Sequence, residues 1–355
     1  MRDVAVVGFE QSPCVRREQN RNEVEVLVPV LRALREQTGV AGADCDFICS
    51  GSSDYLAGQS FAFVSGLDAV GAWPPVSESH VEMDGAWALY EAWVKIQMGQ
   101  AETALVYGFG KPSMGDLPMT MALQLDPYCV MPLWPDAISM AGLQARHCLD
   151  AGVLTEREMA AAAARDRRHA MQNLNAQLRW DRSVDEILAE PYLANPLRKS
   201  DCAPISDGAS AILLAAGDRA REICERPAWI RGIEHICEPI DLGVRDLGRS
   251  RSTQIAAEKA GVGSGKIDVA ELSAPFTHQE ILVERALGLS LDSSSQTVVN
   301  PSGGALAGNP LMAVGLSRIG ECASRIFSGE ADRGVAHATS GPCLQQNLIC
   351  VLEGE

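Results

Sequence analysis

The sequence predicts a large α/β fold made of two similar halves, and an internal repeat is the main evidence. One copy runs from an apolar helical stretch through Gly39 to a buried strand that follows Asp46. The other copy runs through Gly261 to a buried strand that follows Asp268, at the same interval. Glycine readily adopts the left-handed conformation that ends a helix, so each copy predicts a helix, a short turn and a strand.

A second helix and strand follow each copy. In the first half, a helical stretch over residues 86–97 precedes an apolar strand over residues 103–107. In the second half, a helical stretch that ends near residue 323 precedes a strand over residues 335–338. Strands that alternate with helices at this spacing favour a sheet covered by helices on its faces.

The repeat also divides the chain. We expect a first half over residues 1–220 and a second half over residues 221–355. Residues 111–200 have no counterpart in the second half, so they predict a large insertion in the first half. An insertion of this size usually covers a functional site or forms an interface.

Composition narrows the classes of partner. The 355-residue chain has a formal net charge of −16, which repels nucleic acid and requires a local basic patch for any anionic ligand. No apolar run is long enough to span a bilayer, and the amino-terminal residues read as a strand rather than a signal peptide. The eleven cysteines show no disulfide framework, so we expect a reduced, cytoplasmic protein.

Three sequence motifs point to a family. Residues 167–177 contain a helix end followed by Asn175-Ala176-Gln177, residues 202–210 read CAPISDGAS, and residues 300–304 read NPSGG. Together they resemble the thiolase superfamily, in particular its sterol carrier protein X and lipid-transfer-protein branch. The resemblance implies the thiolase fold, in which two βαβαβαββ halves form a layered αβαβα core. It also implies a homodimer or a heterodimer with another thiolase-like chain.

The position of the expected nucleophile holds no cysteine. A thiolase places a cysteine at the start of a helix, where the helix dipole lowers the pKa of the thiol. Counting back from Gly99 places this position at Glu82, and counting forward from Val81 places it at Gly85. Neither register finds a sulfur atom.

The other catalytic motifs are altered as well. The Gly-His-Pro motif of the family is similar to residues 308–310, where Asn309 replaces the histidine. The motif that ends in Ala-Phe is similar to residues 273–276 and begins with Ser273. The second catalytic cysteine falls at residue 340 or 341, with Cys343 close by. Four changes together indicate that Claisen chemistry has been lost.

An oxyanion site without a nucleophile suits chemistry that proceeds through an enolate. The chain resembles nucleophile-less steroid side-chain aldolases of this branch, which implies retro-aldol cleavage of a β-hydroxyacyl-CoA in lipid or steroid degradation. Those enzymes depend on tyrosines, whereas this chain has only five, none after Tyr192. The alternatives are an atypical acyltransferase, and a non-catalytic thiolase-like subunit or acyl-CoA-binding or lipid-binding module. The branch also implies a small OB-fold/zinc-ribbon partner protein.

The candidate bases are Asp84, Glu82 and His278, although Asp84 could equally be a helix N-cap. Asn309 is the candidate hydrogen-bond donor to the acyl oxygen. Cys343 could be reactive, although a buried free thiol is the more common state of cysteine.

The candidate residues for binding the CoA thioester are mostly glycines. We expect amides near Gly85, Gly303 and Gly304, together with Ser302, to contact the thioester. Arg168 is a candidate for the CoA phosphates, although a solvated helix face explains such a residue equally well. We expect no bound cofactor and no metal ion, since CoA is part of the substrate.

Overall fold

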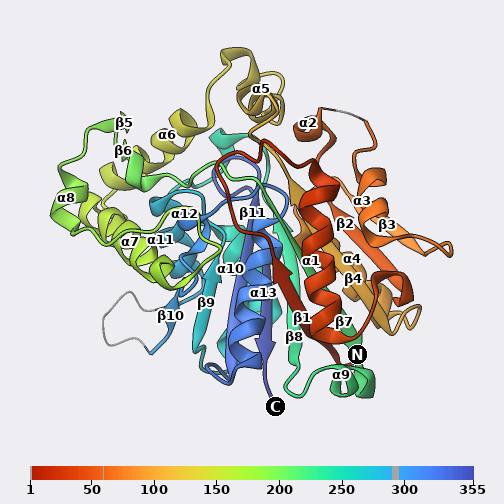
Figure 1. Ribbon diagram of the computed structural model, residues 1–355. Coiled ribbons are helices and arrows are strands. Elements are labelled where there is room, and N and C mark those ends of the chain that lie inside the picture. Colours follow the sequence, from red (N-terminus) through yellow and green to blue (C-terminus); the bar gives the residue numbers. More distant parts are fainter. Residues whose placement is uncertain (1, 59, 290–295) are drawn as a thin grey trace.

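The computed structural model describes residues 2–58, 60–289 and 296–355. Ten strands form one mixed sheet in the order β10-β9-β11-β12-β8-β1-β7-β4-β2-β3 (Figure 1). The first half contributes β1 (Val4–Gln11), β2 (Phe47–Gly51), β3 (Glu78–Val81), β4 (Thr103–Gly110) and β7 (Gly208–Ala216). The second half contributes β8 (Ala228–Cys237), β9 (Val269–Leu272), β10 (Val298–Val299), β11 (Arg333–Ser340) and β12 (Gln346–Glu353).

The two halves have the same strand order. Read from the outer edge inward, the first half runs β3-β2-β4-β7-β1 and the second runs β10-β9-β11-β12-β8. They meet where β1 pairs with β8, through Ala5 opposite Trp229 and Val6 opposite Ala228. The predicted duplication is confirmed.

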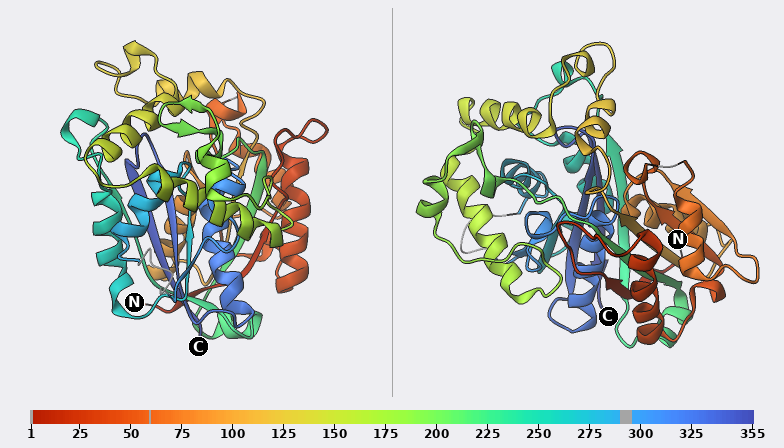
Figure 2. Two further views of the ribbon diagram at one scale, coloured as in Figure 1. Left: turned by 90° about the vertical axis from the view of Figure 1, so that its left-hand side faces the viewer. Right: turned by 45° about the horizontal axis from the view of Figure 1, so that its top comes forward.

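Helices form three layers around the strands. Helices α4 (Gly85–Gln97) and α13 (Val314–Phe327) contact each other and pack on strands of the inner faces. Helices α1 (Glu23–Thr38) and α3 (Phe63–Val70) cover the outer face of the first half. Helices α10 (Arg251–Ala260) and α11 (Thr277–Ala286) cover the outer face of the second half. This is the predicted αβαβα arrangement. The right-hand view of Figure 2 shows the red and orange part of the first half on one side of the molecule, and the second half with the insertion on the other.

The repeated glycine and aspartate residues have matching roles. Gly39 ends α1 and Gly261 ends α10, both in the left-handed conformation. Short 3-10 turns follow them, η1 (Gly42–Asp44) and η6 (Val262–Ser264). Asp46 then accepts hydrogen bonds from the amides that open β4, and Asp268 accepts them from the amides that open β11. The same interval therefore builds the same local structure twice.

The insertion lies between β4 and β7 and extends over the top and one side of the molecule (Figure 1). It contains α5 (Leu117–Leu123), α6 (Ala137–Asp150), α7 (Glu156–His169), α8 (Val184–Leu188), β5 (Tyr192–Ala194) and β6 (Leu197–Arg198). The shorter helices α2 (Asp54–Ala57), α9 (Gly217–Ile223) and α12 (Gly304–Ala307) complete the chain. In the described part, no helix has the length and apolarity that a membrane crossing requires, and all eleven cysteines are free thiols.

Candidate active site

The candidate site is the corner where α4 and α13 begin, because both central helices direct their amino termini to it. Asp84 is the N-cap of α4, and its carboxylate accepts a hydrogen bond from the Ala86 amide at 2.9 Å. The same carboxylate accepts two more from the Gly315 and Leu316 amides at the start of α13, each at 3.0 Å. One buried side chain thus caps two helices from different halves of the chain.

Opposing effects act on the pKa of the Asp84 carboxyl group. Burial raises the pKa of Asp84 above its usual value, while the three amide hydrogen bonds and Arg318 act to lower it. Both carboxylate oxygens already accept hydrogen bonds from the backbone. To act as a base, Asp84 would have to give up contacts that hold the two helices together.

The first amides of α4 are also occupied. The Gly85 amide donates to the Met312 carbonyl at 2.9 Å, and the Trp87 amide donates to the Asp84 carbonyl. A Cβ at position 85 would lie 2.9 Å from the Leu316 side chain, so a larger residue there would require its neighbours to shift. The expected use of the Gly85 amide for a thioester oxygen would require this contact with Met312 to break.

Glu82 is the accessible carboxylate of the corner. Its side chain is 45% exposed, and its Oε1 accepts a hydrogen bond from the Asp54 amide at 2.8 Å. Its Oε2 lies 3.4 Å from Nε2 of His80 on β3. Nδ1 of His80 lies 3.1 Å from Oγ of Ser50 on β2, and the imidazole stacks on Phe63 with ring centroids 4.4 Å apart. Glu82 and His80 form a connected acid–base pair in which the histidine is held on three sides.

Asn309 is held by two of the motifs that suggested the family. The backbone amide of Asn309 donates to Oγ of Ser206 at 3.0 Å, and the Ser206 hydroxyl donates to Oε1 of Gln177 at 2.7 Å. Asn309 is itself half-buried. The loop after Asn309 supplies Met312, whose carbonyl accepts from Gly85, so this segment packs against the start of α4.

A cysteine that sequence reasoning did not select lies beside Asn309. The Cys14 thiol is near enough to Gly308 that a Cβ on that glycine would be 2.9 Å from the sulfur. Burial raises the pKa of the Cys14 thiol to about 11, despite the opposing charge of Arg318. The thiol is therefore protonated at neutral pH, which disfavours it as a nucleophile.

Several predicted site residues are buried in the protein interior. His278 on α11 is fully buried, its Nε2 lies 3.2 Å from Oε1 of Gln144, and burial lowers its pKa to about 3. Ser273 is buried, and its amide donates to the His337 carbonyl. Cys343 is buried too, and burial raises the pKa of its thiol to about 11.

The expected CoA-contacting residues of the second half are internal as well. Ser302, Gly303 and Gly304 are buried, and Oγ of Ser302 donates to the carboxylate of Glu271 at 2.6 Å. Arg168 is exposed and pairs with Asp181 at 2.7 Å. The hydrogen bond from the Gly85 amide to the Met312 carbonyl joins the Asn309 loop to the start of α4, beside Asp84. The contacts of Glu82 go instead to the Asp54 amide and to His80, and Arg168 lies on α7 of the insertion.

Comparison with known proteins finds relatives of the whole chain. No protein-family model matches the chain. The acetyl-CoA acetyltransferase of Methanothermobacter thermautotrophicus is 27% identical, and the alignment covers 96% of this chain and 95% of that protein. Human sterol carrier protein 2 is 28% identical over 74% of this chain and 54% of its own length.

Two solved structures share the fold. An Ltp2-ChsH2(DUF35) aldolase has a TM-score of 0.80 and 17% identity over 99% of this chain and 97% of its own. Human mitochondrial 3-ketoacyl-CoA thiolase has a TM-score of 0.76, also with 17% identity, over 100% of this chain and 99% of its own. The fold and the paired helix starts thus define a thiolase-like protein. The chain has the thiolase fold, and its sequence is similar to those of acetyl-CoA acetyltransferases and of sterol carrier protein 2.

Proposed function

We propose that this protein cleaves a carbon–carbon bond of a β-hydroxyacyl-CoA by a retro-aldol reaction, without a covalent cysteine intermediate. The observation that carries the proposal is the chemistry of the α4 corner, where carboxylates stand at positions 82 and 84 and residues 78–97 contain no cysteine. The fold likeness to an aldolase and the similarity to acetyl-CoA acetyltransferases support the reaction class and the CoA thioester.

Glu82 is the base in this proposal. Its carboxylate takes the proton of the β-hydroxyl group, the Cα–Cβ bond breaks, and its electron pair becomes the enolate of the shortened thioester. The other product is a ketone or an aldehyde, and the enolate is then protonated at carbon. His80 orients Glu82 and relays the proton that Glu82 has taken to the α carbon of the enolate. The side-chain amide of Asn309 donates a hydrogen bond to the enolate oxygen.

A second candidate function is that of a thiolase-like subunit without catalytic activity of its own. The observation that favours it is the occupancy of the helix amides by Asp84 and Met312, which ties the positive ends of both helices to groups of the protein itself. In this case an active thiolase-like chain or a small OB-fold partner would complete the assembly.

The test uses the purified chain, alone and with a co-expressed partner. Turnover of β-hydroxyacyl-CoA is measured as release of the carbonyl product, with β-ketoacyl-CoA thiolysis as the comparison. We expect Glu82→Gln to lower kcat by about 100-fold or more, as loss of a general base does, and Glu36→Gln on the exposed face of α1 to leave kcat unchanged. Activity that depends only on residues of the partner would support the subunit alternative and contradict the proposal.

A further inference from the structure

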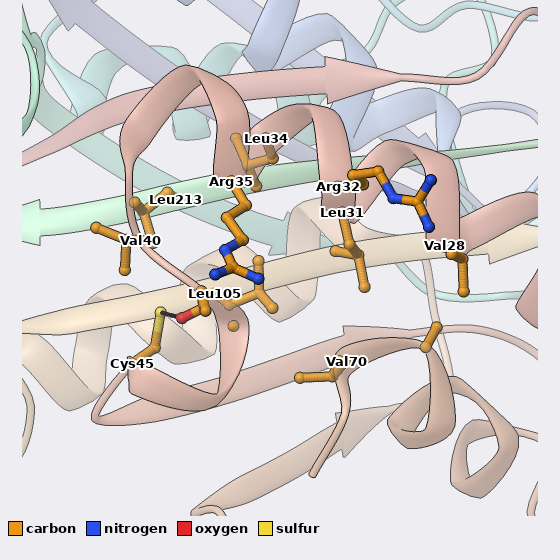
Figure 3. Close-up of a pocket in the computed structure, with 13 residues that line it drawn as sticks. Val28, Leu31, Arg32, Leu34, Arg35, Val40, Cys45, Val70, Leu105 and Leu213 are labelled. Carbon is orange, nitrogen blue, oxygen red and sulfur yellow. Dashed lines mark hydrogen bonds between the residues drawn. The ribbon is translucent and has the colours of Figure 1, made fainter. Parts of the chain in front are cut away.

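A groove with a volume of about 200 Å³ lies on the outer face of the first half, under α1 (Figure 3). Helix α1 forms one wall, the turn around η1 and the end of α3 form the other, and β4 and β7 form the floor. None of its residues belongs to the corner at α4. The lining consists of Val28, Leu31, Arg32, Leu34, Arg35, Val40, Ala41, Gly42, Cys45, Ala69, Val70, Leu105 and Leu213.

The interior of the groove is apolar and uncharged. Leu34, Leu105 and Leu213 are buried and form its deepest part. Cys45 is buried too, and burial raises the pKa of its thiol to about 12, so the sulfur is neutral at physiological pH. No aspartate or glutamate is among the described lining residues. An apolar chain would therefore meet no charged group below the rim.

The rim carries two positive charges. Arg32 and Arg35 are exposed and three positions apart, so they lie on one face of α1. Within the described ranges, neither arginine makes an ion pair, although acidic residues outnumber basic ones by 46 to 30. In Figure 3, Arg35 extends from α1 over the groove toward Leu105, and Arg32 lies farther along the same helix.

The corresponding place in the second half provides an internal comparison. A larger groove of about 760 Å³ lies between α10, η6 and α11, where the duplication predicts one. Its arginines are already neutralised, because Arg249 pairs with Asp246 and Arg285 pairs with Glu158. Glu258 also lines this groove. Only the first-half groove combines an apolar interior with arginines that have no acidic partner in the described chain.

We propose that the first-half groove binds the anion of a free medium-chain fatty acid. The carboxylate would pair with Arg35, since a guanidinium group matches a carboxylate in shape and charge, and Arg32 would add a second positive charge farther along α1. A volume of 200 Å³ holds about seven groups the size of a water molecule, or a tail of about eight carbons. This site is separate from the proposed reaction and does not depend on it.

The test is calorimetric titration of the full chain with hexanoate, octanoate and decanoate below their micelle concentrations. Binding should tighten about tenfold from hexanoate to octanoate and then level off, because further methylenes extend beyond the groove. Arg32→Gln combined with Arg35→Gln should weaken octanoate binding at least tenfold. Arg249→Gln, in the second-half groove, is the matched control and should leave it unchanged.

Ligand chemistry separates this proposal from the alternatives. Octanol and octyltrimethylammonium should bind at least tenfold more weakly than octanoate, because neither offers an anion to the arginines. Val70→Phe should also weaken octanoate binding, with circular dichroism confirming that the variant is folded. Unchanged binding in the double arginine variant, equal loss in Arg249→Gln, or arginine-dependent binding only to octanoyl-CoA or to phosphatidylglycerol vesicles would overturn the proposal.

Discussion

Replacing Asp84 with alanine should destabilise the protein much more than removal of an ordinary helix cap. The carboxylate accepts from three buried amides, those of Ala86, Gly315 and Leu316, at 2.9–3.0 Å. A buried donor that loses its partner costs about 1–3 kcal/mol. The alanine variant also relieves the desolvation of the carboxylate, so we expect a net loss of about 3 kcal/mol in the free energy of unfolding.

The assay is urea denaturation followed by far-ultraviolet circular dichroism at neutral pH. Asp116→Ala is the matched control, because Asp116 is an exposed N-cap whose side chain accepts from a single helix amide, that of Met119. It should cost about 1 kcal/mol or less. If Asp84→Ala were no more destabilising than Asp116→Ala, the double-cap account would be wrong. If Asp84→Ala abolished turnover at unchanged stability, Asp84 would be a catalytic residue instead.

Three further changes have defined outcomes in the same denaturation assay. Burial and the charge of Asp166 raise the pKa of Glu280 well above its usual value of 4.5, so the native state keeps a proton that the unfolded state releases. Stability should therefore fall as pH rises above that usual value, and it should fall less steeply in Glu280→Gln. Burial lowers the pKa of His278 to about 3, so as pH falls the unfolded state binds a proton at this histidine before the native state does. Stability should therefore fall as pH drops below about 6.5, and it should fall less steeply in His278→Gln. A Cβ on Gly320 would lie 2.0 Å from Phe9, so Gly320→Ala should cost about 1–3 kcal/mol, and a loss below about 0.5 kcal/mol would contradict the packing.

The repeated part of the fold was predictable because its signals are local. The interval from Gly39 to Asp46 recurs from Gly261 to Asp268. In each copy the glycine ends a helix and the aspartate fastens the start of a neighbouring strand. Short-range chemistry sets each of these features, so a single sequence displays them twice.

The contacts at the candidate site were less accessible to sequence reasoning. Asp84 reads as a helix cap, but its bonds to Gly315 and Leu316 join residues more than 230 positions apart. The pairing of His80 with Ser50 depends on the parallel register of β2 and β3, which places these two residues side by side. Such contacts come from tertiary packing, which periodicity does not encode.

His278 illustrates the converse problem. Polar residues on α11 suggest a face in contact with solvent or ligand, yet residues 277–284 are all buried. Helices α6 and α7 of the insertion pack against α11 and supply polar partners such as Gln144. Because the insertion has no counterpart in the second half, the repeat gave no indication that it covers this helix.

The central claim is that the site works without a sulfur nucleophile. Intact-protein mass spectrometry after incubation with acyl-CoA and β-ketoacyl-CoA tests it most directly, with peptide mapping of any adduct. We predict that the mass of the native protein stays unchanged while β-hydroxyacyl-CoA is turned over. A stable acyl adduct on Cys14 or Cys343 that forms at the rate of turnover would contradict the account.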